Sequence, residues 1–214
     1  MTALLILGAG GQARVLAETA VAQGGFSHIA FLDDHAAQET DQPSVLGWPV
    51  LGPLKRFIEP QIRQSFNAAL VGIGDAKTRL VWLEQLARVG YECPCLIHPT
   101  AWVSPSASLG SGSVVFSQAA VQAQASIGSG VILNTGCSVD HDVQLANGVH
   151  VCPGAHLAGD VQVGSRSWIG IGASVIQQVR IASDVIVGAG AVVVSDLPVG
   201  VTVVGVPARI LKKS

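Results

Sequence analysis

An aliphatic residue recurs at every sixth position in the C-terminal half of the chain. All sixteen positions of this series are Val, Ile or Leu. A period of six matches neither the 3.6-residue period of an α-helix nor the two-residue period of a strand. It is typical of a solenoid in which each hexapeptide forms one short strand and one corner. The series reads Val103, Leu109, Val115, Val121, Ile127, Leu133, Val139, Leu145, Val151, Leu157, Val163, Ile169, Val175, Ile181, Val187 and Val193.

Three such hexapeptides close one triangular coil, so the series predicts about five coils of eighteen residues. The aliphatic side chains point inward, and small residues or Val four places later fit the narrow interior. We therefore expect residues 96–214 to form a left-handed parallel β-helix. The stretch from Cys93 to Val139 contains no Asp, Glu, Lys or Arg, and Phe116 and Trp168 fall at expected outward or corner positions. A large uncharged surface is typical of an interface, which predicts a homotrimer of parallel prisms.

Residues 1–95 alternate between strand-like and helical patterns. This order predicts a small Rossmann-like parallel sheet with helices on its faces, an α/β domain. The expected elements are a strand over Ala3–Leu7, a helix ending at Gly24, strands over His28–Leu32 and Ala68–Ile73, and a helix over Thr78–Val89.

A glycine-rich turn follows the first strand. Gly8, Gly10 and Ala13 match the G-x-G-x-x-G/A pattern, and Asp33 lies twenty residues after Ala13 at the end of the second strand. Glycines let the backbone approach a diphosphate at a helix N-terminus, and the acid accepts a hydrogen bond from a ribose or base. The alternative is a tight turn without a ligand. The domain is only half a dinucleotide fold, which favours the UDP of a sugar nucleotide over NAD.

The composition excludes several classes of partner. The 12 Lys and Arg residues against 14 Asp and Glu give a net charge of −2, which argues against nucleic acid and anionic membranes. No apolar run is long enough for a membrane-spanning helix, and we identify no signal peptide. The four Cys have no metal-binding spacing, so we expect reduced thiols in the cytoplasm and no metal site.

His141 is the strongest candidate for a catalytic base. It lies two places after the inward Val139, near a corner, between Asp140 and Asp142. Its counterpart one coil later is Gly159, which leaves open space above the ring. A histidine flanked by carboxylates accepts a proton near neutral pH, and the alternative is a solvated corner. His150 and His156 are expected to face outward, and His141 and His150 converge only across a subunit interface.

Several motifs across nearly the whole chain resemble the sialic acid O-acetyltransferase and UDP-4-amino-sugar N-acetyltransferase family, which is NeuD/PglD-like. The resemblance implies acetyl-CoA lying along the solenoid between neighbouring subunits, and a nucleotide sugar bound by the N-terminal domain. The motifs are GAGGQA (8–13), FLDD (31–34), IHPTAWVSPSA (97–107), SVDHD (138–142), HVCPGAHLAGDV (150–161) and GVPAR (205–209).

The resemblance also implies roles for individual residues. His141 is the implied general base, and Asp142 the residue that raises its basicity. Relatives commonly carry His where this chain has Gln12, which affects the substrate contacts there. The implied acetyl-CoA groove is lined by His150, Ile171 and Ala189, and the implied contacts to the nucleotide sugar are Gly10, Gly11, Gln12, Asp33, Asp34 and Gly74.

We therefore predict an N-acetyltransferase that uses acetyl-CoA as co-substrate and acetylates the amine of a UDP-linked 4-amino-4,6-dideoxy sugar by direct transfer. One alternative is an O-acetyltransferase for a sialic acid or another sugar hydroxyl. A second is a trimeric zinc lyase of carbonic-anhydrase type, which needs three converging histidines. A third is a non-catalytic NAD-binding or scaffold protein. The basic cluster of Arg209, Lys212 and Lys213 fits either the CoA phosphates or a solvated tail.

Overall fold

The computed structural model describes residues 2–35 and 43–211. The chain divides into two compact units, Met1–Leu96 and Ile97–Ser214. Each unit is described by itself. No helix among the described residues is long and apolar enough to cross a membrane.

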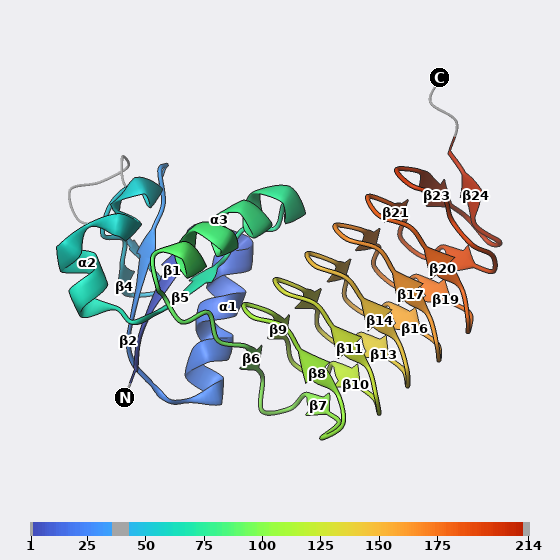
Figure 1. Ribbon diagram of the computed structural model, residues 1–214, viewed down its shortest axis with the longest axis horizontal. Coiled ribbons are helices and arrows are strands. Elements are labelled where there is room, and N and C mark those ends of the chain that lie inside the picture. Colours follow the sequence, from blue (N-terminus) through green and yellow to red (C-terminus); the bar gives the residue numbers. More distant parts are fainter. Residues whose placement is uncertain (1, 36–42, 212–214) are drawn as a thin grey trace. The chain divides into compact units, whose positions relative to one another are not determined.

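The first unit is built on a three-stranded parallel sheet in the order β2-β1-β5 (Figure 1). The sheet confirms the predicted strand and helix alternation. Its strands are β1 (Thr2–Leu7), β2 (Phe26–Leu32) and β5 (Ala68–Val71), and its longer helices are α1 (Gly11–Gln23) and α3 (Ala76–Arg88). The segment between β2 and β5 adds elements that the sequence pattern did not predict: β3 (Ser44–Val45), β4 (Trp48–Pro49), η2 (Leu54–Ile58) and α2 (Pro60–Ser65).

The central strand β1 is buried on both sides, because Leu4, Leu5, Ile6 and Leu7 all have no exposed area. Continuous apolar runs of this kind are typical of parallel strands covered on both faces. All three strands run in the same direction, so their carboxyl ends meet at one edge of the sheet. The glycine-rich turn before α1 and the loop before α3 both start from that edge.

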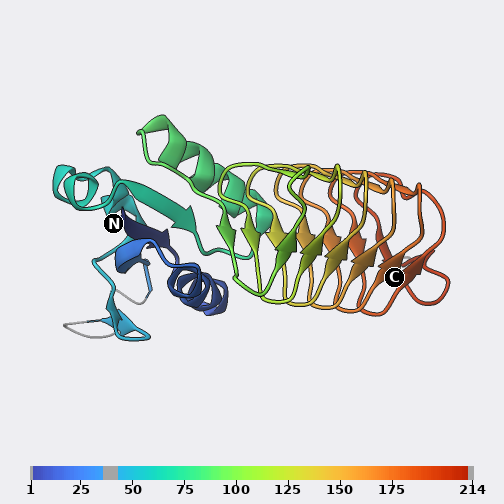
Figure 2. The same ribbon diagram turned by 90° about the horizontal axis from the view of Figure 1, so that it is seen from below.

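The second unit is a three-sided parallel β-helix, and Figures 1 and 2 show its coils stacked along one axis. Face 1 contains β6 (Leu96–Ile97), β9 (Val114–Val115), β12 (Ile132–Leu133), β15 (His150–Val151), β18 (Trp168–Ile169), β21 (Ile186–Val187), β23 (Thr202–Val204) and β24 (Arg209–Ile210). Face 2 contains β7 (Trp102–Val103), β10 (Ala120–Val121), β13 (Ser138–Val139), β16 (His156–Leu157), β19 (Ser174–Val175) and β22 (Val192–Val193). Face 3 contains β8 (Ser108–Leu109), β11 (Ser126–Ile127), β14 (Gln144–Leu145), β17 (Gln162–Val163) and β20 (Arg180–Ile181).

The register between coils is eighteen residues on all three faces, as the hexapeptide period predicts, up to the last coil, where Ile186 pairs with Thr202 only sixteen residues later. Ser138, for example, pairs with Ala120 in the preceding coil and with His156 in the next. From Val115 onward, every aliphatic residue of the sixfold series is at most 3% exposed. These side chains fill the interior of the prism, and their burial is the main source of its stability.

The corners repeat as regularly as the strands. The corner after face 2 holds Gln124, Asp142, Asp160 and Gln178, one from each successive coil, and all four have φ between 60° and 63°. This left-handed conformation costs little for Asp and more for most other side chains. At the corner after face 3, Arg166 forms a bidentate ion pair with Asp184 of the next coil. Its Nε is 2.7 Å from Oδ1 of Asp184, and its Nη2 contacts Oδ2.

Two expectations for the outer surface have different outcomes. Trp168 is 40% exposed, as expected for an outward residue. Phe116 was expected at an outward or corner position, but it is only 1% exposed. The uncharged sequence around Phe116 therefore includes a covered side chain, and it does not form a continuous exposed surface.

Candidate active site

His141 lies at the corner between β13 and β14, as the sequence predicts. Its Nδ1 is 2.8 Å from Oδ2 of Asp142, and its backbone N–H donates to Oδ1 of Asp140, also over 2.8 Å. The His141 side chain remains 60% exposed. Because a carboxylate only accepts, Nδ1 must carry the shared hydrogen, which leaves the lone pair of Nε2 for a substrate.

The next coil is shaped around this imidazole. A β-carbon at Gly159 would lie 2.5 Å from both Cε1 and Nε2 of His141. Any side chain at that position would therefore have to displace the ring. The backbone N–H of the following residue, Asp160, donates to the His141 carbonyl over 3.0 Å and holds the two corners in register.

The surroundings of His141 raise its pKa above the ordinary value of 6.5. The hydrogen bond that His141 donates to Asp142 is the largest cause. Desolvation opposes it, and the charges of Asp140, Asp142 and Asp160 each raise the pKa by a smaller amount. Each of these carboxylates stabilises the imidazolium form. The pair therefore has both the geometry and the basicity of a general base.

His141 opens into a recess of about 690 Å³ on the side of face 3. The recess has the size of a small-molecule site. Its lining is almost entirely polar, so hydrogen bonds and charge would dominate the recognition of a ligand. It is lined by Gln124, Ser126, His141, Asp142, Gln144, Asp160 and Gln178.

His150 does not have the exposure that the sequence suggests. It was expected to face outward, yet it is only 5% exposed. Its ring lies against Trp168 of the next coil, with centroids 4.2 Å apart, and its Nε2 is 3.1 Å from Nδ2 of Asn134. The neighbouring tryptophan covers this histidine. His156, by contrast, is exposed, and its Nδ1 lies 2.8 Å from Oγ of Ser138.

The residues suggested for the acetyl-CoA groove occupy a different corner from His141. Ile171 lies between β18 and β19, and Ala189 between β21 and β22, so both belong to the corner after face 1. Ile171 is 61% exposed, and Ala189 is exposed as well. One copy of the chain therefore does not bring these residues onto the corner that holds His141.

The α/β unit brings its suggested nucleotide residues to the carboxyl edge of the sheet. Gly10 is the N-cap of α1, and no N-cap side chain accepts from the first N–H groups of the helix. A β-carbon at Gly10 or Gly74 would meet no atom within 4 Å. Gln12, in the first turn, has a buried Nε2 without a hydrogen-bond partner among the described residues. This arrangement suits an anion such as a diphosphate.

Asp33 has a second role that the sequence did not suggest. Its Oδ2 accepts from the backbone N–H of Ala9 and its Oδ1 from that of His35, both over 2.9 Å. Asp34 accepts from the N–H of Leu54, also over 2.9 Å. Both acids therefore fix the loops at the edge of the sheet.

Arg79 is a functional candidate that sequence reasoning missed. It is 2% exposed, and its Nη1 donates to the carbonyls of Ile73 and Gly74 over 3.0 and 2.6 Å. Burial lowers its pKa to about 10, against the opposing charge of Asp75. In the sequence it resembles any basic residue on an exposed helix, because no local pattern marks the carbonyls that it contacts.

The cysteine thiols and the C-terminal basic residues are less suited to a catalytic or binding role than His141. Burial raises the pKa of the Cys137 and Cys152 thiols to about 12, so both remain protonated near neutral pH. Arg209 donates to its own neighbour's carbonyl, at Ala208, over 2.9 Å. Lys212 and Lys213 lie outside the described residues. Within the described part of the chain, no group of three or more His, Cys, Asp or Glu is placed to hold a metal ion.

Comparisons with known proteins agree with this architecture. A family model described as the PglD N-terminal domain matches residues 3–86. The acetyltransferase domain of PglB from Neisseria gonorrhoeae FA1090 is 44% identical, with a TM-score of 0.93 over 99% of this chain and 100% of that one. A second structure of that domain, in complex with acetyl coenzyme A, has a TM-score of 0.90 over 98% and 99% of the two chains.

Perosamine N-acetyltransferase from Caulobacter crescentus is also similar. Its H141N mutant, in complex with CoA and GDP-perosamine, is 39% identical and has a TM-score of 0.93 over 100% of this chain and 98% of that one. A comparison with curated protein sequences gave no match. These full-length similarities show that the chain belongs to the PglD-like family of hexapeptide-repeat acetyltransferases.

Proposed function

We propose that this protein transfers the acetyl group of acetyl-CoA to the amine of a nucleotide-linked 4-amino-4,6-dideoxy sugar. The observation that carries the proposal is the His141–Asp142 pair, with its 2.8 Å contact and its Nε2 directed to a polar recess. The two relatives support it, since one binds acetyl coenzyme A and the other binds CoA with GDP-perosamine. The H141N and H141A mutants of the second relative both carry a histidine substitution.

In the proposed reaction, the sugar amine attacks the thioester carbonyl while Nε2 of His141 takes one amine proton. A C–N bond forms, and the C–S bond breaks when the tetrahedral intermediate collapses. The thiolate of CoA leaves and takes up the proton from the imidazolium. Asp142 keeps the Nδ1 hydrogen in place and stabilises the imidazolium in between. No covalent intermediate on Ser or Cys is required.

The developing oxyanion needs a hydrogen-bond donor. The N–H of Asp160 is already engaged by the His141 carbonyl, so we assign this role to the backbone N–H of Gly159. The absence of a side chain there keeps both the ring and the reacting carbonyl within reach of the corner. Direct transfer in a ternary complex follows from this arrangement.

The nucleotide is assigned to the α/β unit. The uncapped N-terminus of α1 would bind the diphosphate, and the unpaired Nε2 of Gln12 would donate to it or to the sugar. Gly10, Gly11 and Gly74 would let the ligand approach the backbone, while Asp33 and Asp34 would contact the nucleoside, as the family resemblance implies. We propose a UDP-linked substrate, and a GDP-linked one is the second candidate because the Caulobacter crescentus relative binds GDP-perosamine.

The donor site is proposed to lie between two copies of the chain. Ile171 and Ala189 occupy the corner after face 1, whereas His141 occupies the corner after face 2. If Ile171, Ala189 and the neighbouring His150 contact acetyl-CoA, then the first corner of one copy must meet the second corner of another. Repeating this heterologous contact around a closed ring gives the proposed homotrimer.

We also propose that the enzyme acts in the cytoplasm, where acetyl-CoA is made and thiols stay reduced. Its four cysteines are free, which fits a reducing compartment. The direct transfer requires no metal ion.

The test is a thiol-release assay with acetyl-CoA and a panel of UDP-, GDP-, dTDP- and CMP-linked sugars, each offered with an amine or a hydroxyl at the reacting position. We expect CoA release with an amino sugar and at most slow release with the hydroxyl analogue. Release only with a hydroxyl acceptor would replace N-acetylation by O-acetylation. No CoA release with any member of the panel would remove the transferase proposal.

A further inference from the structure

Face 2 carries an outward column of side chains that includes no Asp, Glu, Lys or Arg. Its members occupy the first position of each strand, so they pair in register from coil to coil. None of the site residues assigned above lies in this column. From the first coil to the last, the column reads Trp102, Ala120, Ser138, His156, Ser174 and Val192.

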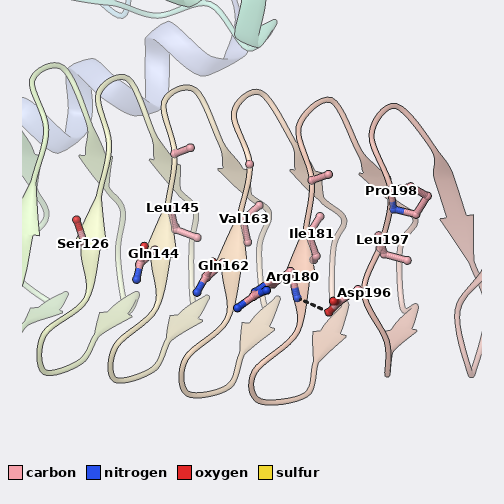
Figure 3. Close-up of a pocket in the computed structure, with 13 residues that line it drawn as sticks. Ser126, Gln144, Leu145, Gln162, Val163, Arg180, Ile181, Asp196, Leu197 and Pro198 are labelled. Carbon is pink, nitrogen blue, oxygen red and sulfur yellow. Dashed lines mark hydrogen bonds between the residues drawn. The ribbon is translucent and has the colours of Figure 1, made fainter.

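The equivalent column of face 3 is different. Gln144, Gln162 and Arg180 lie in register there, along a groove of about 710 Å³ that Asp196 lines at its far end (Figure 3). Polar and charged side chains of this kind suit a face in contact with water. An uncharged column of mostly small side chains suits a face that packs close to other protein.

The proposed ring of three copies determines where face 2 lies. In each contact the corner after face 1 of one copy meets the corner after face 2 of the next, and these two corners are the two edges of face 2. Three copies joined in this way turn face 2 toward the three-fold axis and turn faces 1 and 3 outward. Each residue of the column then lies at the same height as its two counterparts.

Histidines from all three copies can reach this axis. Six extended residues span at most about 20 Å, so three such faces around an axis place each backbone roughly 6 Å from it. An imidazole side chain together with a metal–nitrogen bond of about 2.0–2.1 Å covers a distance of this size. Ser138 and Ser174, directly below and above His156, are small and leave room for the three rings to meet.

His156 is also oriented as a metal ligand would be. Its side chain is exposed, and its Nδ1 lies 2.8 Å from Oγ of Ser138. When the hydroxyl accepts from Nδ1–H, the lone pair is on Nε2, at the tip of the ring. Metal-binding histidines are held in the same way, by a second-shell group that accepts from the other ring nitrogen.

The space beside His156 favours a cation. A recess of about 360 Å³ on face 2 is lined by Ser138, Asp140, His156 and Ser174, among others. Oδ1 of Asp140 accepts from the backbone N–H of His141, and the carboxylate keeps its negative charge. In the ring, three such recesses face one another across the axis, so three carboxylates would attract a positive ion.

We propose that the three copies of His156 bind one divalent transition-metal ion, such as zinc, on the three-fold axis through their Nε2 atoms. This inference rests on the trimer of the proposed function and adds a structural site to it. The ion joins the chains and has no part in acetyl transfer at His141. One copy supplies a single ligand, so the described part of one chain contains no metal-binding group of its own.

The test measures zinc in untagged protein that has been dialysed against zinc and then against metal-free buffer. We expect one zinc ion per three chains, and none in His156→Ala. Ser138→Ala keeps the ligand but loses the group that orients it, so its zinc affinity should fall about tenfold or more. Zinc should raise the melting temperature of the wild-type protein and leave that of His156→Ala unchanged.

Two further variants locate the ion. His28→Ala removes an exposed histidine of the α/β unit, and His141→Ala removes the proposed base; both should keep one zinc ion per three chains. The inference is overturned if the wild-type protein retains no zinc, or if His156→Ala retains as much as the wild type. Zinc lost in His141→Ala would place the ion at that corner and also overturn it.

CoA release by the same samples separates this site from the proposed function. Protein that retains no zinc but releases CoA with an amino sugar contradicts only the axial site. Protein that retains one zinc ion per three chains but releases no CoA with any sugar contradicts only the acetyl transfer. A chelator should lower the melting temperature of the wild-type trimer without stopping CoA release at a temperature where the protein stays folded.

Discussion

The imidazole of His141 occupies the space that a side chain of Gly159 would need: a β-carbon there would lie 2.5 Å from Nε2. The two residues are eighteen apart and sit at equivalent places in successive coils, so the solenoid itself brings them together. The position of the ring is therefore set by the coil above it as much as by Asp142. This relationship can be tested separately from the proton transfer.

Gly159→Ala is expected to push the ring of His141 out of its position and to lower kcat by about tenfold or more, because small displacements of a catalytic group are costly. Steady-state kinetics with saturating acetyl-CoA and sugar nucleotide measure the change. The same substitution in a His141→Ala background is the control, since the clash is absent there. An equal loss in both backgrounds would show that Gly159 acts independently of the ring.

His141→Ala should lower turnover by about a hundredfold or more while the protein keeps its fold and its oligomeric state. The side chain is largely exposed, so its removal leaves no cavity in the core. Turnover is followed by CoA release, and assembly by light scattering on the same sample. Unchanged turnover would remove His141 from the mechanism.

Asp142→Asn should shift the pH dependence of kcat/KM. His141 acts as a base only when neutral, so activity rises with pH through its pKa, which Asp142 raises above 6.5. Asparagine still accepts from Nδ1–H but carries no charge, so the acidic limb should move to lower pH and the rate at the plateau should fall. A profile with an unmoved acidic limb would assign that limb to another group.

Arg79→Met should loosen the loop that contains Ile73 and Gly74. The carbonyls of Ile73 and Gly74 lose a buried donor, which should cost about 1–3 kcal/mol of unfolding free energy. If the loop also contacts the nucleotide, the KM for the sugar nucleotide rises while the KM for acetyl-CoA stays constant. Arg79→Lys is the companion variant. Equal changes in both KM values would indicate a general loss of folding instead of a local effect.

The hexapeptide series predicts the solenoid well, because each position has one environment in every coil. Val139 is inward for the same reason as Val121 and Leu157, and the corner position of His141 follows by counting. The hexapeptide pattern does not predict which outward-facing side chains are buried. His150 and Phe116 were expected to face outward, yet both are buried. For His150 the burial involves Trp168 of the next coil, a contact that a local period does not encode.

The α/β unit is less predictable from its sequence. Strands such as β1 can be predicted from the sequence because they are uniformly apolar. The elements β3, β4, η2 and α2 are short and have no clear hydrophobic period, so they were not predicted. The roles of Asp33 toward Ala9 and of Arg79 toward Gly74 depend on loops meeting at the sheet edge.

The eighteen-residue register allows the solenoid to change its length in whole coils. Duplicating one complete coil beyond Gly159 would lengthen the solenoid by about 4.8 Å and leave every downstream side chain on its own face. Inserting six residues instead would turn everything beyond the insertion onto the next face. A whole-coil duplication beyond Gly159 therefore keeps His141 next to Gly159, whereas a six-residue insertion between these two residues separates them.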